Sequence, residues 1–157
     1  MKDMFGRYFL SVALWALSFA FASAQTPVEK IIIKYEDVKG ARDLMLSGAK
    51  LSIARGLIRQ TQVGSLADDV DKLAVLKMGN ASQQDKTLFY DDLVVALKSY
   101  QYCGKHPGKN GPVDVYISAP SGEIVKELVI YNPAIYSLNS LYGTFTIDSL
   151  LKLTGGQ

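Results

Sequence analysis

The chain has 157 residues, enough for one domain around a single hydrophobic core and too few for two comfortable domains. Its 17 basic and 15 acidic side chains nearly cancel and leave a formal net charge of +2, which argues against the broad basic surface that nucleic-acid binding requires. The sequence contains one cysteine, Cys103, so a disulfide scaffold is excluded.

Residues 1–24 have the pattern of a secretory signal peptide. A positively charged start precedes an uncharged apolar stretch at residues 8–21, and Ala22-Ser23-Ala24 supplies the small residues that signal peptidase accepts. The alternative is an uncleaved membrane anchor, which needs about 20 apolar residues. No cysteine lies near the cleavage point to carry a lipid. We therefore expect residues 25–157 to be exported as one domain without a membrane span, to the periplasm or beyond the cell.

The exported part opens with a well-marked helix. Thr26 can act as its N-cap, Pro27 fits the first helical position, and Glu29 completes a Thr-x-x-Glu capping box. Gly40 ends this element. The apolar side chains that follow the cap recur at helical spacing, which predicts one buried face.

In the next segments the spacing of apolar residues alternates between the period of a strand and the period of a helix. We expect a strand at 41–46, a helix at 47–60 and a second strand at 71–78, whereas 61–70 is polar and has no clear period. Ser82 caps the clearest helix. The apolar stripe of that helix is Phe89, Leu93, Ala96, Leu97 and Tyr100.

The segment from Gly104 to Gly111 holds three glycines and a proline and is predicted to be a loop. Strand-like runs follow at 113–118, 124–131 and 135–142, joined by short turns that favour antiparallel neighbours, and Thr146 caps a short last helix. These elements predict an α+β domain with a mainly antiparallel sheet, a C-terminal three-stranded meander and helices packed on one face.

This layout resembles the domain-of-unknown-function family 4252, a group of small exported Bacteroidetes proteins. The likeness lies in an EK-x-x-x-KY helix (Glu29, Lys30, Lys34, Tyr35), in the charged turn Ser121-Gly122-Glu123 before IVKELVIY, and in the closing YGTFTIDSLLKL. The resemblance implies an exported α+β protein of a Gram-negative envelope without an established activity. It supplies no catalytic residues.

Cys103 and His106 are the weak catalytic candidates. A thiol near an imidazole, with Lys105 between them, could form an activated nucleophile or contribute two metal ligands. A structural metal site normally needs four ligands, and the sequence has no other cysteine or histidine. The alternative is an inert thiol beside a solvated histidine, so neither a metal nor another cofactor is expected.

Charged clusters offer two further candidates. Lys105, His106 and Lys109 could form an anion-binding nest with the backbone amides of their loop, or a solvated connector without the spacing of a nucleotide loop. The acidic pairs could instead supply paired carboxylates, but neighbouring residues on one element diverge, so a solvated surface is the alternative. These acidic residues are Asp68, Asp69, Asp71, Asp91 and Asp92.

Tyrosines suggest a binding surface on the meander. If Tyr116, Val129 and Tyr131 share one face of the sheet, they form an apolar and aromatic platform that could stack on a sugar ring or dock a protein. Helices covering this face are the alternative, because a one-sided sheet must bury its apolar face.

The sequence thus predicts an exported, non-enzymatic module that binds a protein or a glycan of the cell envelope. A small hydrolase or thiol enzyme using Cys103 and His106 is the second hypothesis. The third is a structural component that self-associates through a sheet edge; the oligomeric state is left open.

Overall fold

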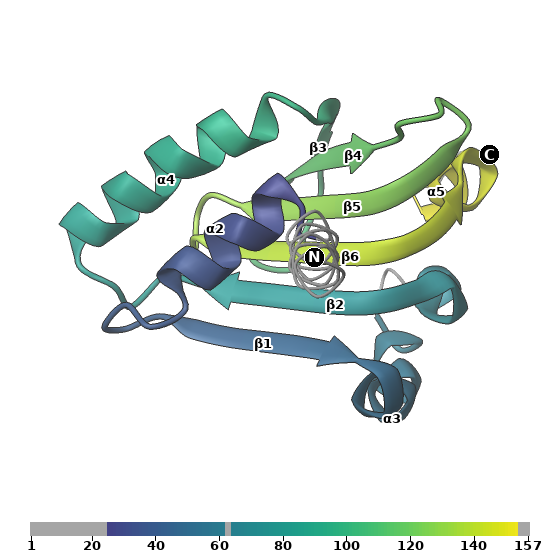
Figure 1. Cartoon of the computed structure of the whole chain (residues 1–157), viewed down its shortest axis with the longest axis horizontal. Coiled ribbons are helices and arrows are strands. Elements are labelled where there is room, and N and C mark those ends of the chain that lie inside the picture. Colours follow the sequence, from purple (N-terminus) through teal and green to yellow (C-terminus); the bar gives the residue numbers. More distant parts are fainter. Residues whose placement is uncertain (1–24, 62–63, 154–157) are drawn as a thin grey trace, which may run out of the picture.

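The computed structural model describes residues 25–61 and 64–153, which contain one six-stranded antiparallel sheet with helices on both of its faces (Figure 1). The strands are β1 (Arg42–Ser47), β2 (Val70–Lys77), β3 (Gln101–His106), β4 (Val113–Ser118), β5 (Ile124–Asn132) and β6 (Ser137–Thr146). The helices are α2 (Pro27–Tyr35), α3 (Gly48–Ile58), the 3-10 helix η1 (Gly64–Asp69), α4 (Gln83–Leu97) and α5 (Ile147–Leu153).

The strand order is β1-β2-β6-β5-β4-β3. The expected α+β class and antiparallel sheet are confirmed, and β4, β5 and β6 form the predicted meander. A fourth strand, β3, joins that meander through its pairing with β4. The N-terminal pair β1 and β2 lies beside β6, so the strand nearest the C-terminus occupies the middle of the sheet.

The predicted loop at 104–111 begins later than expected, because β3 continues to His106. The register of β3 on β4 shifts between Tyr102 and Lys105, and Gly104 has a φ of 94°. A glycine with positive φ is the residue that a β-bulge favours. Gly104 therefore lets the strand continue through a bulge, where the sequence pattern suggested a break.

The helices are not confined to one face. We call the face that bears α2 and α4 the covered face; its sheet residues include Leu76, Val129, Tyr131 and Leu138. The opposite face, which we call the open face, bears Leu128 and Leu141. Both faces present apolar side chains because neighbouring residues of a strand point in opposite directions, so each face needs cover.

The covered face packs against the apolar sides of α2 and α4. Phe89 and Leu93 of α4 are fully buried, as is Ile32 of α2, and the rings of Tyr35 and Phe89 meet edge to face with centroids 5.6 Å apart. The predicted N-cap hydrogen bonds are present, whereas the carboxylate of Glu29, which was expected to complete a capping box, pairs with Lys72 instead. The cap oxygens accept the expected backbone N–H at 3.1 to 3.2 Å: Thr26 from Glu29, Ser82 from Asp85, and Thr146 from Ser149.

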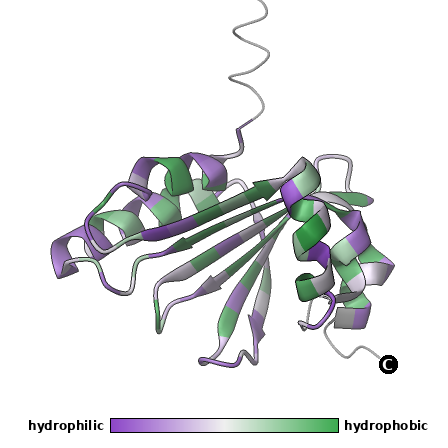
Figure 2. Cartoon of the chain, turned by 90° about the horizontal axis from the view of Figure 1, so that it is seen from below, coloured by the Kyte–Doolittle hydropathy of each residue, from purple (hydrophilic) through white to green (hydrophobic). Residues whose placement is uncertain are grey.

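The open face is covered at one end only. Figure 2 shows α3 and α5 gathered at that end of the sheet, while α2 and α4 lie across the other face. Helices α3 and α5, together with η1, enclose a second hydrophobic core against the open face. This core includes Leu51, Leu66, Val125 and Phe145. The part of the open face formed by β3, β4 and β5 extends beyond these helices. In the described part of the chain, no helix is long and apolar enough to cross a membrane.

A buried carboxyl group links three separate segments on the covered face. Glu127 of β5 is 1% exposed. It accepts hydrogen bonds from the hydroxyls of Thr26 (2.9 Å), Ser140 (2.8 Å) and Tyr100. The Tyr100 hydroxyl also accepts a bond from Val28 N, and burial, followed by the bond to Glu127, raises the pKa of Tyr100 above its ordinary value. The hydroxyl therefore keeps its proton and remains a donor.

Two leucines of α4 test the assignment of the covered core. Leu93 is fully buried and Leu88 is 50% exposed. We expect Leu93→Ala to lower the free energy of unfolding by about 2–5 kcal/mol and Leu88→Ala to change it by less than about 0.5 kcal/mol. Urea titration followed by circular dichroism measures both. Equal losses in the two variants would contradict the packing.

Glu127→Gln tests the buried network. The amide places an N–H₂ donor against hydroxyl donors, so at least one buried polar group loses its partner. We expect the free energy of unfolding to fall by about 1–3 kcal/mol. Glu123→Gln on the exposed turn before β5 is the matched control, and it should behave as the unchanged protein in the same denaturant titration.

Candidate functional site

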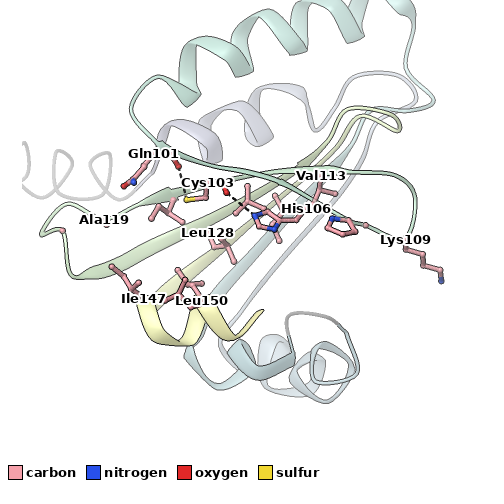
Figure 3. A pocket seen from close by; sticks show the side chains of 16 residues that line it. Gln101, Cys103, His106, Lys109, Val113, Ala119, Leu128, Ile147 and Leu150 are labelled. Atoms are coloured by element: carbon pink, nitrogen blue, oxygen red, sulfur yellow. Dashed lines mark hydrogen bonds between the residues drawn. The ribbon is translucent and has the colours of Figure 1, made fainter. Parts of the chain in front are cut away.

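The uncovered part of the open face holds a groove of about 940 Å³ (Figure 3). Strands β4 and β5 form its floor, α5 forms one wall, and β3 with the loop that follows it forms the other. Its apolar lining includes Val113, Val115, Ile117, Ala119, Leu128, Ile130, Ile147, Leu150 and Leu151. Its polar lining is Gln101, Cys103, His106 and Lys109. Among the described residues that line it there is no aspartate or glutamate.

Strand register explains why these side chains meet. Val115 lies opposite Ile130, and Ile117 lies opposite Leu128, so two apolar pairs stand side by side on the floor. On the other side of β4, Ile117 pairs with Gln101, and His106 pairs with Val113. The alternation of β4 thus carries its valines and isoleucine to the open face, while Tyr116 points to the covered face.

Cys103 and His106 both line the groove, but their bonds do not form a catalytic pair. The His106 Nε2 atom lies 3.2 Å from the backbone oxygen of Cys103, and the Cys103 sulfur contacts the backbone oxygen of Gln101 at 3.7 Å. Cys103 is exposed, and desolvation by its neighbours in the groove raises the pKa of the thiol above its ordinary value. A raised pKa reduces the thiolate fraction at neutral pH, which opposes nucleophilic catalysis.

The proposed anion nest is divided between the two faces. Lys105 lies on the covered side of β3, where its Nζ pairs with Asp114 at 3.1 Å, and this bond raises the pKa of Lys105. Lys109 and His106 lie along the groove on the open side. The structure therefore keeps one lysine beside the groove and takes the other away from it.

The tyrosine platform is present but covered. Tyr116 pairs with Val129 across β4 and β5, and Tyr131 follows on the same face, as the sequence suggested. However, α2 and α4 pack over it, leaving Val129 fully buried and Tyr131 3% exposed. The alternative of a helix-covered face therefore holds, and only Tyr116 retains partial exposure.

The acidic clusters serve the surface and the helix packing. Asp68 pairs with Arg59 at 2.5 Å. Asp92 accepts hydrogen bonds from Lys34 (2.7 Å) and Tyr35 (2.5 Å), which hold its pKa below the ordinary value and join α4 to α2. Within residues 25–61 and 64–153, no group of three or more potential ligands could hold a metal ion.

Sequence reasoning identified the rim of the groove but missed its floor. Alternation in 113–118 was visible, yet it does not show which set of side chains a helix will cover. The available signal was that β5 carries apolar residues on both faces, since Leu128 and Ile130 alternate with Val129 and Tyr131. Such a strand needs cover on both sides, and here one cover is incomplete.

No family model matches the chain, and neither a curated protein nor a solved structure matches it significantly. The geometry of the groove is therefore the basis for a functional proposal.

The reactivity of Cys103 follows from its surroundings. Cys103 is exposed, but because desolvation raises the thiol pKa, its alkylation by iodoacetamide should be slow at pH 7 and should increase as the pH rises through that pKa. We expect its midpoint to lie above that of an unstructured cysteine peptide measured alongside by mass spectrometry. A midpoint below that of the peptide would instead indicate an activated thiolate and would favour the enzyme hypothesis.

Proposed function

We propose that this chain is an exported binding module of a Gram-negative cell envelope, not an enzyme, and that it takes up an apolar group of an envelope component in the groove. The observation that carries the proposal is the groove itself. Its volume falls within the roughly 300–1,000 Å³ typical of small-molecule sites, and like them it combines an apolar lining with a few polar groups.

The lining favours an apolar ligand over a glycan. Sugar rings need flat aromatic surfaces and many hydrogen-bond partners, and no phenylalanine, tyrosine or tryptophan is among the described residues that line the groove. The tyrosines considered for sugar stacking lie beneath α2 and α4. Of the two partners expected from the sequence, a protein and a glycan, the lining therefore fits an apolar side chain of a protein better than a sugar. It also fits other apolar groups of the envelope, which the sequence did not suggest.

The export part of the proposal is supported by the signal-peptide pattern in the sequence of residues 1–24 and by the resemblance to family 4252. The non-enzymatic part is supported by the bonding of Cys103 and His106, each of which contacts a backbone oxygen.

A neutral fluorescent probe, N-phenyl-1-naphthylamine, tests the groove. We expect its fluorescence to rise on binding the native protein, and Ile117→Asp to weaken binding at least about tenfold, because a carboxylate would be desolvated against the apolar floor. Val95→Asp is the matched control, since Val95 is 63% exposed on α4, and it should bind as the unchanged protein does. Thermal unfolding confirms that both variants fold.

Two results of this experiment would reject the proposal: no fluorescence rise with the native protein, or equal binding by Ile117→Asp. Cys103→Ala addresses the enzyme hypothesis in parallel. Probe binding should survive this substitution, whereas a hydrolytic or thiol activity detected in the native protein and abolished in Cys103→Ala would establish the alternative.

A further inference from the structure

The two basic side chains of the groove, His106 and Lys109, lie at one end, which we call the polar end, whereas α5 and the pair of Gln101 with Ile117 lie toward the other end. Val113, at the start of β4, lies beside the loop that carries Lys109, and it pairs with His106 of β3. Ile117 and Ala119, at the other end of β4, lie toward Ile147 and Leu150 of α5. Figure 3 shows this division, with His106 and Lys109 on one side of the floor residues and α5 on the other.

The charge of the lining has one sign. Lys109 is exposed and lies at the polar end, and no acidic side chain is among the described residues that line the groove. The nearest aspartate along β4, Asp114, points to the covered face and is bonded to Lys105 and Tyr102. In Figure 3 the Lys109 side chain extends outward from its loop, so it offers a cation at the mouth of the groove, with no carboxylate among the described lining residues.

The floor is suited to an alkyl chain rather than a peptide. Strands β4 and β5 each have a neighbour on both sides, so their backbone N–H and C=O groups are already paired. A peptide entering the groove would bury its own backbone groups without partners, at a considerable cost. An alkyl chain has no polar group to satisfy along its length, and the floor extends for about 13 Å from Val113 to Ile117 at the usual rise of a strand.

We propose that the ligand of the groove is a single-chain fatty-acid anion, with its alkyl chain along β4 and β5 toward α5 and its carboxylate beside Lys109 and His106. This assignment rests on the proposed function, because it specifies which apolar group the module takes up. It gives Lys109 the role of a specificity residue for the head group, while the floor residues supply most of the affinity.

Displacement of N-phenyl-1-naphthylamine by three ligands of equal chain length tests the assignment. The ligands are dodecanoate, dodecanol and dodecyltrimethylammonium, each below its micelle-forming concentration. We expect dodecanoate to bind about tenfold more tightly than the ammonium ligand, with dodecanol between them. Shortening the alkyl chain of the fatty-acid anion should weaken its binding about threefold to fourfold for each methylene removed.

Lys109→Gln and Lys105→Gln form a matched pair on the same segment. Lys109→Gln should weaken the binding of dodecanoate about twofold to fivefold and leave the binding of dodecanol unchanged. The difference in dodecanoate affinity between Lys109→Gln and the unchanged protein should shrink at high salt. Lys105→Gln should change the affinity for neither ligand, because Lys105 faces the other side of the sheet.

The outcomes separate this assignment from the proposed function. Probe binding that is sensitive to Ile117→Asp but shows no preference for the carboxylate would overturn the anionic head group and leave the binding module intact. Probe binding that none of the dodecyl ligands displaces would overturn the alkyl-chain class. Mass measured in solution identifies the remaining case: a dimer that dissociates in Ile117→Asp would show a second copy in the groove and also overturn the assignment.

Discussion

The covered face depends on one constraint, the burial of the Glu127 carboxyl group. A buried carboxyl group is costly unless its oxygens accept hydrogen bonds, and here the donors come from Thr26 before α2, Tyr100 after α4 and Ser140 on β6. Ser140 lies on the strand next to Glu127, but the hydroxyls of Thr26 and Tyr100 reach Glu127 only when both helices lie across the sheet. The polar network therefore selects one placement of α2 and α4, while the surrounding apolar contacts supply most of the stability of that placement.

The site arises from an imbalance between the two faces. The long helices cover one face, whereas α3, η1 and α5 are short and gather at one end of the other. Apolar residues of β4 and β5 that continue past α5 are left half-buried, among them Val115 and Ile130. In the proposed function, this partly exposed apolar strip beside a loop with a lysine is the surface that takes up the ligand.

Features set by neighbouring residues could be predicted from the sequence, and features set by tertiary contacts could not. The caps at Thr26, Ser82 and Thr146 depend on side chains three residues from their partners, so they were evident. Gly104 suggested a loop because glycine often interrupts a strand. In the structure it forms a β-bulge instead, and a bulge can be recognised only once the pairing of β3 with β4 is known. The burial of Tyr131 and the exposure of Val115 depend on which face receives the long helices. Strand alternation is the same in either case, so it cannot decide between them.

The position of β6 has a consequence for the order in which the domain assembles. Strands β1 and β2 pair with each other early in the chain, but the second neighbour of β2 is β6, with Lys72 opposite Tyr142. A two-stranded ribbon is marginally stable alone in water, and pairings between residues so far apart in sequence form slowly. Strand β2 therefore keeps one edge unpaired until β6, near the C-terminus, lies beside it. Because β6 also pairs with β5, its placement joins the N-terminal strand pair to the meander in one step.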